Sequence, residues 1–192
     1  MALCSTADVT AYLNITSTGE NTLISTFVDA AQAMIERYTG RKFDVTQDST
    51  RYFNPVIDVR GKSLHFDGEL AQAPTTVVNG DGVAVTAQQY ATEPKNQAPY
   101  YGLRLLQSGG VAWTWATDPE GAIAVTGRWG YSTTAPADVK HAAIRLAAWL
   151  YRQRENAPEA DRTITTITGD TLRPMRMPAD VESILAPYVR RA

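Results

Sequence analysis

The chain has 192 residues, a formal net charge of −2 and a single cysteine. This length is typical of one domain with a real hydrophobic core. The near-neutral charge argues against strong non-specific attraction to nucleic acid or anionic membranes. One cysteine, Cys4, excludes an intrachain disulfide and a metal site built on a cysteine pair.

The sequence has no pattern typical of a targeting signal. The segment 1–10 lacks a basic region followed by an apolar core, so we expect no signal peptide. No stretch approaches the roughly 20 apolar residues that span a bilayer, so we expect no membrane contact. The simplest compartment for such a chain is a reducing cytosol.

Helical signals open the chain. Ser5 and Asp8 have the spacing of a capping box and predict a short first helix. A second helix is predicted from about Glu20 to Thr39, and Gly40 stands where a helix ends in the left-handed conformation. Apolar residues recur at helical spacing in this second helix, namely at Leu23, Ile24, Phe27, Ala31, Met34, Ile35 and Tyr38.

From residue 43 to residue 131 the period changes to that of strands. Turn signals at 54–55, 67–68, 79–82 and 118–121 separate short runs of strand-forming residues. The spacing predicts a small antiparallel sheet or barrel-like subdomain between helical segments, and hence an α+β fold. The expected strands cover residues 51–53, 63–66, 75–78, 83–86, 103–106, 111–115 and 123–126.

A long helix is predicted from about Pro136 to Asn156. The stretch 157–177 has little regular pattern, although Ile164 and Ile167 could belong to a short strand. A last short helix begins at Pro178 and is limited by Pro187. We therefore expect a single domain over residues 1–192, with a helical core (5–42 and 135–156), a β insertion (43–131) and a loop with tail (157–192).

The long helix carries more apolar surface than one buried face needs. At about 100° per residue its apolar arc covers roughly 220°, against a stripe of about 100° for a one-sided helix. Either the helix is central, packed between the sheet and the second helix, or one flank contacts a neighbouring subunit. The candidate interface residues are Ile144, Ala148 and Tyr151 on one flank, which we favour, and Trp149 on the other.

Catalytic patterns are missing. His65 lies in a predicted strand and His141 on the polar stripe of the long helix, and neither has a nucleophile at a recognisable spacing. Gly80-Asp81-Gly82 lacks the third glycine of a dinucleotide fingerprint and predicts a hairpin turn. The carboxylate pairs at 67/69 and 118/120 fall in predicted turns. We expect no enzyme activity, no cofactor and no metal.

Two binding surfaces remain open at this point. Trp113, Trp115 and Trp129 could form a ligand platform, although we interpret them as sheet core. Basic residues concentrate towards the C-terminus, but they lack the interleaved aromatic residues of a single-strand binder, so we favour a solvated or protein-contacting surface. They are Arg145, Arg152, Arg154, Arg173, Arg176, Arg190 and Arg191.

Four patterns in order resemble the head–tail connector, or adaptor, family of tailed phages and gene transfer agents. The matching segments are 35–41 (IERYTGR), 125–131 (VTGRWGY) followed by 136–140 (PADVK), 148–151 (AWLY) and 184–188 (ILAPY) with the arginines after it. The resemblance covers the two ends of the chain. The middle, roughly 44–118, resembles the variable β insertion of larger members.

The resemblance implies a structural role without catalysis or cofactor. Family members form a ring, commonly of twelve copies, beneath the portal after genome packaging. The implied location is the virion neck, and the host cytoplasm during assembly. The ring extends the DNA channel without sequence-specific binding and docks a stopper or tail-completion protein. The C-terminal segment, from Thr163 on, is implied to reach the portal. The implied contact residues are Arg173, Arg176, Val181, Ile184, Leu185, Tyr188, Arg190 and Arg191.

Two other interpretations stay open. A stopper or tail-completion protein of the same neck is the nearest alternative, but we would expect it to be chiefly β. From a different class, a carbohydrate- or ligand-binding β module would use the tryptophan-bearing sheet. An enzyme ranks third, because no motif supports it.

Overall fold

The structure, a computed structural model, describes residues 2–155, 164–165, 171–172 and 177–190. The chain forms two compact units. One contains residues 42–134 and is built of strands; the other contains residues 2–41 and the chain from 135 onwards and is mainly helical. The α+β class expected from the sequence is confirmed. We call the two parts the β unit and the helical unit.

The N-terminal helices begin and end where their capping residues predict. Helix α1 spans Thr6–Leu13, and its capping box is formed: the Asp8 amide donates to Ser5 Oγ at 3.1 Å, while the Ser5 amide donates to Asp8 Oδ2 at 2.8 Å. Helix α2 spans Asn21–Thr39. It ends at Gly40, whose φ of 66° few other residues adopt, and the Gly40 amide donates to the Glu36 carbonyl at 2.9 Å.

The second half of the helical unit follows the β unit in the sequence. Helix α3 spans Ala137–Glu155, and α5 spans Ala179–Leu185 before a 3-10 turn, η2, at Ala186–Tyr188. Between α3 and α5, β8 (Ile164–Thr165) pairs antiparallel with β9 (Thr171–Leu172). The predicted strand at Ile164 is confirmed, whereas Ile167 lies outside the described residues.

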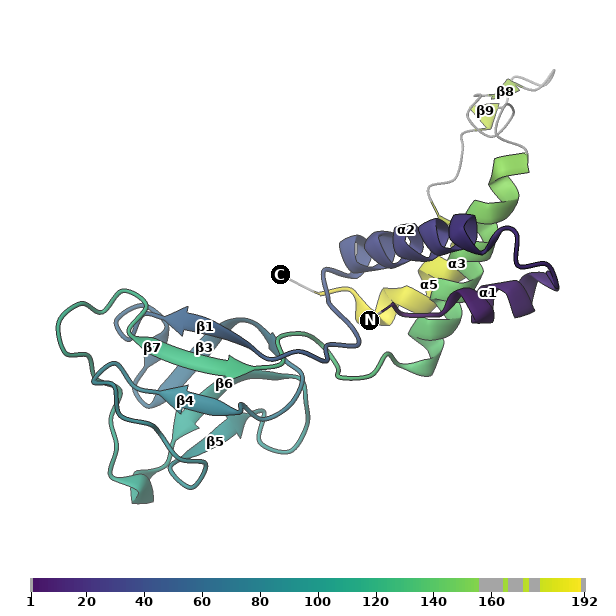
Figure 1. The fold of residues 1–192 in the computed structure, drawn as a ribbon. Coiled ribbons are helices and arrows are strands. Elements are labelled where there is room, and N and C mark those ends of the chain that lie inside the picture. Colours follow the sequence, from purple (N-terminus) through teal and green to yellow (C-terminus); the bar gives the residue numbers. More distant parts are fainter. Residues whose placement is uncertain (1, 156–163, 166–170, 173–176, 191–192) are drawn as a thin grey trace. The chain divides into compact units, whose positions relative to one another are not determined.

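Helix α3 is the centre of the helical unit. Helix α2 packs along it, α1 contacts both α2 and α3, and α5 packs against α3 (Figure 1). The chain supplies apolar side chains at helical spacing on every one of these faces. The buried members are Val9, Ile24, Val28, Ala31, Ile35, Val139, Ala142, Ala143, Leu146, Ala147, Ala148, Tyr151, Val181 and Leu185.

The β unit contains two antiparallel sheets. The first has the order β1 (Ser49–Phe53), β7 (Ile123–Gly127), β4 (Thr76–Val78). The second has the order β2 (Val59–Arg60), β3 (Ser63–Leu70), β6 (Tyr100–Leu105), β5 (Tyr90–Glu93). A short 3-10 turn, η1 (Gln107–Gly109), follows β6.

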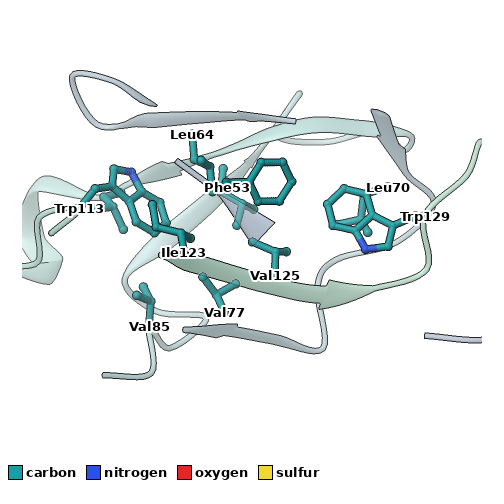
Figure 2. Packing of buried hydrophobic residues seen from close by; sticks show 11 residues of the cluster. Phe53, Leu64, Leu70, Val77, Val85, Trp113, Ile123, Val125 and Trp129 are labelled. Atoms are coloured by element: carbon teal, nitrogen blue, oxygen red, sulfur yellow. The ribbon is translucent and has the colours of Figure 1, made fainter. Parts of the chain in front are cut away.

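One hydrophobic core lies between the strands of the two sheets. In Figure 2 its side chains run from Trp113 and Val85 at one end to Leu70 and Trp129 at the other, with Ile123 and Val125 of β7 between them. The alternation along β7, where residues 123, 125 and 127 are buried, is the period of a half-buried strand.

Two predicted strands are wrong, and each has a local reason. Residues 83–86 make only one bridge, Val78 to Ala84, because the chain has just turned at Gly82. Residues 111–115 make only an isolated bridge, from Trp115 to Gly80. The Asn79 side chain bonds their backbone instead: Nδ2 donates to the Ala112 carbonyl at 2.9 Å and Oδ1 accepts the Thr114 amide at 3.1 Å.

The predicted turn at 67–68 is also wrong. Both residues lie inside β3, where the register with β6 shifts between His65 and Leu70. This irregularity in the pairing accommodates the glycine without ending the strand. The turn at 79–82 is formed as expected, with the Gly82 amide donating to the Asn79 carbonyl at 2.9 Å.

Candidate interaction surfaces

The apolar arc of α3 is largely covered within its own unit. Residues Val139, Leu146 and Ala147 have no exposed surface, and Ala148 is 1% exposed. Three helices, α1, α2 and α5, contact α3. A central position therefore accounts for most of the arc, but the elements that cover α3 are α1, α2 and α5, where we expected the sheet and the second helix.

Tyr151, a candidate interface residue, is 9% exposed and faces α2. Its ring meets Phe27 edge-on at 6.2 Å, and its hydroxyl donates to Glu20 just before α2 begins. Arg154 bonds the other Glu20 oxygen at 3.2 Å and lies 4.8 Å over the Tyr151 ring. The bond from Tyr151, and then that from Arg154, hold the pKa of the Glu20 carboxyl below its usual range.

Ile144 and Trp149 are the candidate interface residues with accessible surface, since both are only half-buried. Trp149 lines a pocket of about 120 Å³ together with Tyr12, which is 44% exposed, and Arg152. Arg145 at the same pocket forms an ion pair with Asp180 at the start of α5. The pocket thus joins aromatic surface to cationic side chains on the helical unit.

The implied portal-contact residues divide by burial. Val181 and Leu185 are fully buried, so a partner could reach them only if α5 left α3. Ile184 is half-buried and Arg190 exposed. The Tyr188 hydroxyl donates to the Asp138 carboxylate, at 2.9 Å to Oδ1 and 2.8 Å to Oδ2. Arg173, Arg176 and Arg191 lie outside the described residues.

No catalytic arrangement is assembled by the described residues. His65 and His141 are exposed on separate elements. Within the ranges described, no three or more histidine, cysteine or acidic side chains come together in a group that could hold a metal. Burial, with Asp8 adding to it, raises the pKa of the Cys4 thiol to about 11, so this thiol is protonated near neutral pH.

Across the same ranges, none of the helices combines the length and the hydropathy that a membrane span requires.

Trp113, Trp115 and Trp129 do not form a ligand platform. Trp113 and Trp129 belong to the core of the β unit, at 9% and 4% exposure, and each indole N–H donates to a backbone carbonyl. Of these three tryptophans, Trp115 is the exposed one, at 44%.

One exposed pair of apolar residues was not predicted from the sequence. Val56 and Ile57 follow the turn signal Asn54-Pro55 and read as an ordinary turn, yet they are 59% and 73% exposed. The signal that could have indicated this exposure is the position of the two aliphatic residues, directly after a turn signal and before Asp58.

Comparison with known proteins decides the family. The family model described as "Head completion protein" matches residues 2–191. The chain belongs to the head completion protein family. No match is found among curated protein sequences.

Solved structures similar to this head completion protein come from gene transfer agent particles. A chain in the neck of an empty particle computed with C6 symmetry has a TM-score of 0.57 at 16% identity, over 97% of this chain and 90% of that one. A chain in the neck of a native particle computed with C12 symmetry has a TM-score of 0.52 at 15% identity, over 88% and 84%. A chain of the native virion gives 0.51 at 16%, over 92% and 81%. At such identities the likeness shows the shared fold.

Proposed function

We propose that the chain is a structural adaptor of the virion neck, which completes the head by forming a ring beneath the portal. The observation that carries the proposal is the family match along almost the whole chain. Its likeness to chains from particle necks supports the location. The role needs no catalysis.

The ring is built from copies of this chain. The similar neck structures were computed with C6 and C12 symmetry, and twelve copies satisfy both. In the helical unit the subunit contact uses the accessible residues Ile144 and Trp149, while Ala148 and Tyr151 hold α3 in place from inside. The pocket beside Trp149 offers a neighbour both an apolar and a cationic contact.

The portal contact uses the C-terminal segment. Ile184, Tyr188 and Arg190 have accessible surface in the helical unit. The buried residues Val181 and Leu185 fix α5, which carries Ile184 and leads into the segment with Tyr188 and Arg190. Arg173, Arg176 and Arg191 complete the basic segment. On its other side the ring extends the DNA channel and docks a stopper or tail-completion protein, and a net charge of −2 suits a conduit that must not retain DNA.

Negative-stain microscopy of the chain mixed with its portal tests the proposal. We expect an additional ring on the portal, and a matched variant, Arg190→Glu with Ile184→Asp, should remain folded but leave the portal bare. A folded wild-type chain that never binds the portal would refute the adaptor role.

A further inference from the structure

The residues that follow α5 contact both long helices of the helical unit. We call residues 186–190 the strap; it begins as the 3-10 turn η2 and is the yellow segment after α5 in Figure 1. The Tyr188 hydroxyl donates to the Asp138 carboxylate, at 2.9 Å to Oδ1 and 2.8 Å to Oδ2. Two residues further on, the Arg190 amide donates to the Thr39 carbonyl at 2.8 Å. The strap is therefore bonded to α3 and to α2 at once.

The two bonds of the strap lie at the helix ends that flank the β insertion. Thr39 is the last residue of α2, and Asp138 is the second residue of α3. The chain enters the β unit after residue 41 and leaves it before residue 135. Within the helical unit, the strap thus connects a residue just before one chain crossing to a residue just after the other.

The bond to Thr39 completes the end of α2. The last carbonyls of a helix have no partner inside it, and an amide from elsewhere in the chain can satisfy one of them. The strap also passes close to the cap residue Gly40, where an added Cβ atom would lie in van der Waals contact with Arg190 Cβ, at 3.6 Å. A cationic side chain suits this place, because the C-terminal end of a helix carries partial negative charge. The strap therefore caps α2 from another part of the chain.

The strap can detach while the helix that carries it stays in place. None of residues 186–190 is buried, whereas Val181 and Leu185 of α5 are fully buried, and α5 packs on α3. Asp138 on the receiving helix is exposed as well, so water can take the place of the Tyr188 hydroxyl at a small net cost. Contacts of this kind open locally without unfolding of the whole protein.

We propose that the strap is a latch on the two chain crossings. In its closed state it fixes the end of α2 and the start of α3 to one segment, and it restrains the residues that lead into and out of the β unit. In its open state it frees these residues and presents Tyr188 and Arg190 to a partner. For this partner the inference rests on the proposed portal contact, which uses the same two residues, and the portal then binds only the open state.

Portal binding and opening of the latch are linked in both directions. A protein whose binding-competent state is a minor one binds with an apparent affinity that is reduced by the fraction of that state. A substitution that opens the latch without changing the strap should therefore strengthen portal binding. Asp138→Ala is such a substitution, because it removes the carboxylate that accepts from Tyr188 and leaves residues 186–190 intact.

Digestion of the full chain with trypsin measures the open fraction at one crossing. Arg41 is the last residue before the β unit, two residues after Thr39. When opening is fast compared with cleavage, the rate of cleavage after Arg41 follows the open population. We expect Asp138→Ala and Tyr188→Phe each to raise this rate at least about five-fold, the factor that one net hydrogen bond supplies. Tyr38→Phe is the matched control, since this ring is exposed on α2, and its rate should equal that of the wild type.

Cleavage after Arg37, which lies inside α2, reports unfolding of the helices and should stay the same in every variant. An unchanged rate after Arg41 in Asp138→Ala and Tyr188→Phe, or a parallel rise after Arg37, overturns the latch and leaves the adaptor role standing. In portal co-sedimentation, Asp138→Ala should bind about five-fold more tightly than the wild type, and equal or weaker binding overturns the link to the portal. A wild type that never binds the portal refutes the adaptor role and this link with it, whereas the trypsin rates judge the latch alone.

Discussion

Tyr151 ties the end of α3 to the start of α2 through one hydroxyl group. The partner of this hydroxyl, Glu20, directly precedes α2, and the Glu20 side chain is 40% exposed. Arg154 completes the cluster from the last turn of α3. Because the carboxylate form of Glu20 receives both bonds, the folded protein favours the ionised glutamate.

We expect Glu20→Gln to lower the thermal midpoint at pH 7. The pKa of Glu20 is depressed by folding, so its stabilisation is present above the usual glutamate pKa of about 4.3 and is lost as the pH falls through the lower folded value. The difference between variant and wild type should therefore shrink in the acid range. Melting curves from pH 7 to pH 3 measure it, with Asp29→Asn as the control. A difference independent of pH would contradict the assignment.

Two tryptophans of the β unit, Trp113 and Trp115, provide a second test of stability. Trp113→Ala empties part of the core and also removes the indole bond to the Lys62 carbonyl at 2.9 Å, so it should cost about 3–5 kcal/mol. Trp115→Ala removes a side chain that is 44% exposed and should cost less than about 1 kcal/mol. Urea unfolding followed by circular dichroism compares them. Equal losses would mean that Trp115 is also a core residue.

The helices could be predicted closely because their signals are local. The capping pair Ser5–Asp8 and the terminal Gly40 fix two helices through neighbours in the sequence. Strands depend on distant partners, which explains the errors. Residues 111–115 alternate like a strand, but the side chain of Asn79, far away in the sequence, takes the place of a paired strand. The β2 strand of two residues and β5 were also missed, although their partners β3 and β6 follow them closely in the sequence.

The candidate contact residues were predictable only in part. The apolar arc of a helix shows which side chains are apolar but not which neighbouring helix covers them. The predicted interface residues therefore included the buried Ala148 and Tyr151 together with the accessible Ile144 and Trp149. The exposure of Val56 and Ile57 was not predicted, because turn signals dominate their segment. Exposure at such places depends on the three-dimensional packing around Asn54, which no local pattern contains.

Helix α5 should separate folding from docking. Leu185→Ala removes a fully buried side chain between α5 and α3, so it should cost about 2–5 kcal/mol. Ile184→Ala changes a half-buried neighbour and should cost less, yet it should weaken binding to the portal. Thermal melting and portal co-sedimentation measure the two effects. Strong destabilisation by Ile184→Ala with normal binding would place the portal contact elsewhere.

The molecule as a whole is two compact units connected by two chain crossings, between residues 41 and 42 and between residues 134 and 135. Each unit has buried apolar residues of its own. In the β unit the two ends of the insertion are bonded to one another: the Tyr131 amide donates to the Lys42 carbonyl at 2.7 Å, and the Val45 amide donates to the Ser132 carbonyl at 3.0 Å.

These features predict that residues 42–134 fold when expressed alone. The core includes side chains from both sheets, and the ends of the segment already meet, so excision breaks few contacts. A cooperative urea transition and dispersed amide resonances would show the fold. Trp129→Ala in the same segment should abolish the transition. An unfolded segment would mean that the β unit depends on the helices for its stability.

The bonded ends of the β unit have a consequence for the order of folding. In the sequence, α2 precedes the insertion and α3 follows it. In the unfolded chain, contact between the two helices therefore requires closing a very long loop, at an entropic cost. Once the β unit has folded, the bonded pair Lys42 and Tyr131 replaces that loop with a much shorter connection, and the effective contact order of the helical unit falls. We therefore expect the folded insertion to accelerate the docking of α2 and α3 on one another.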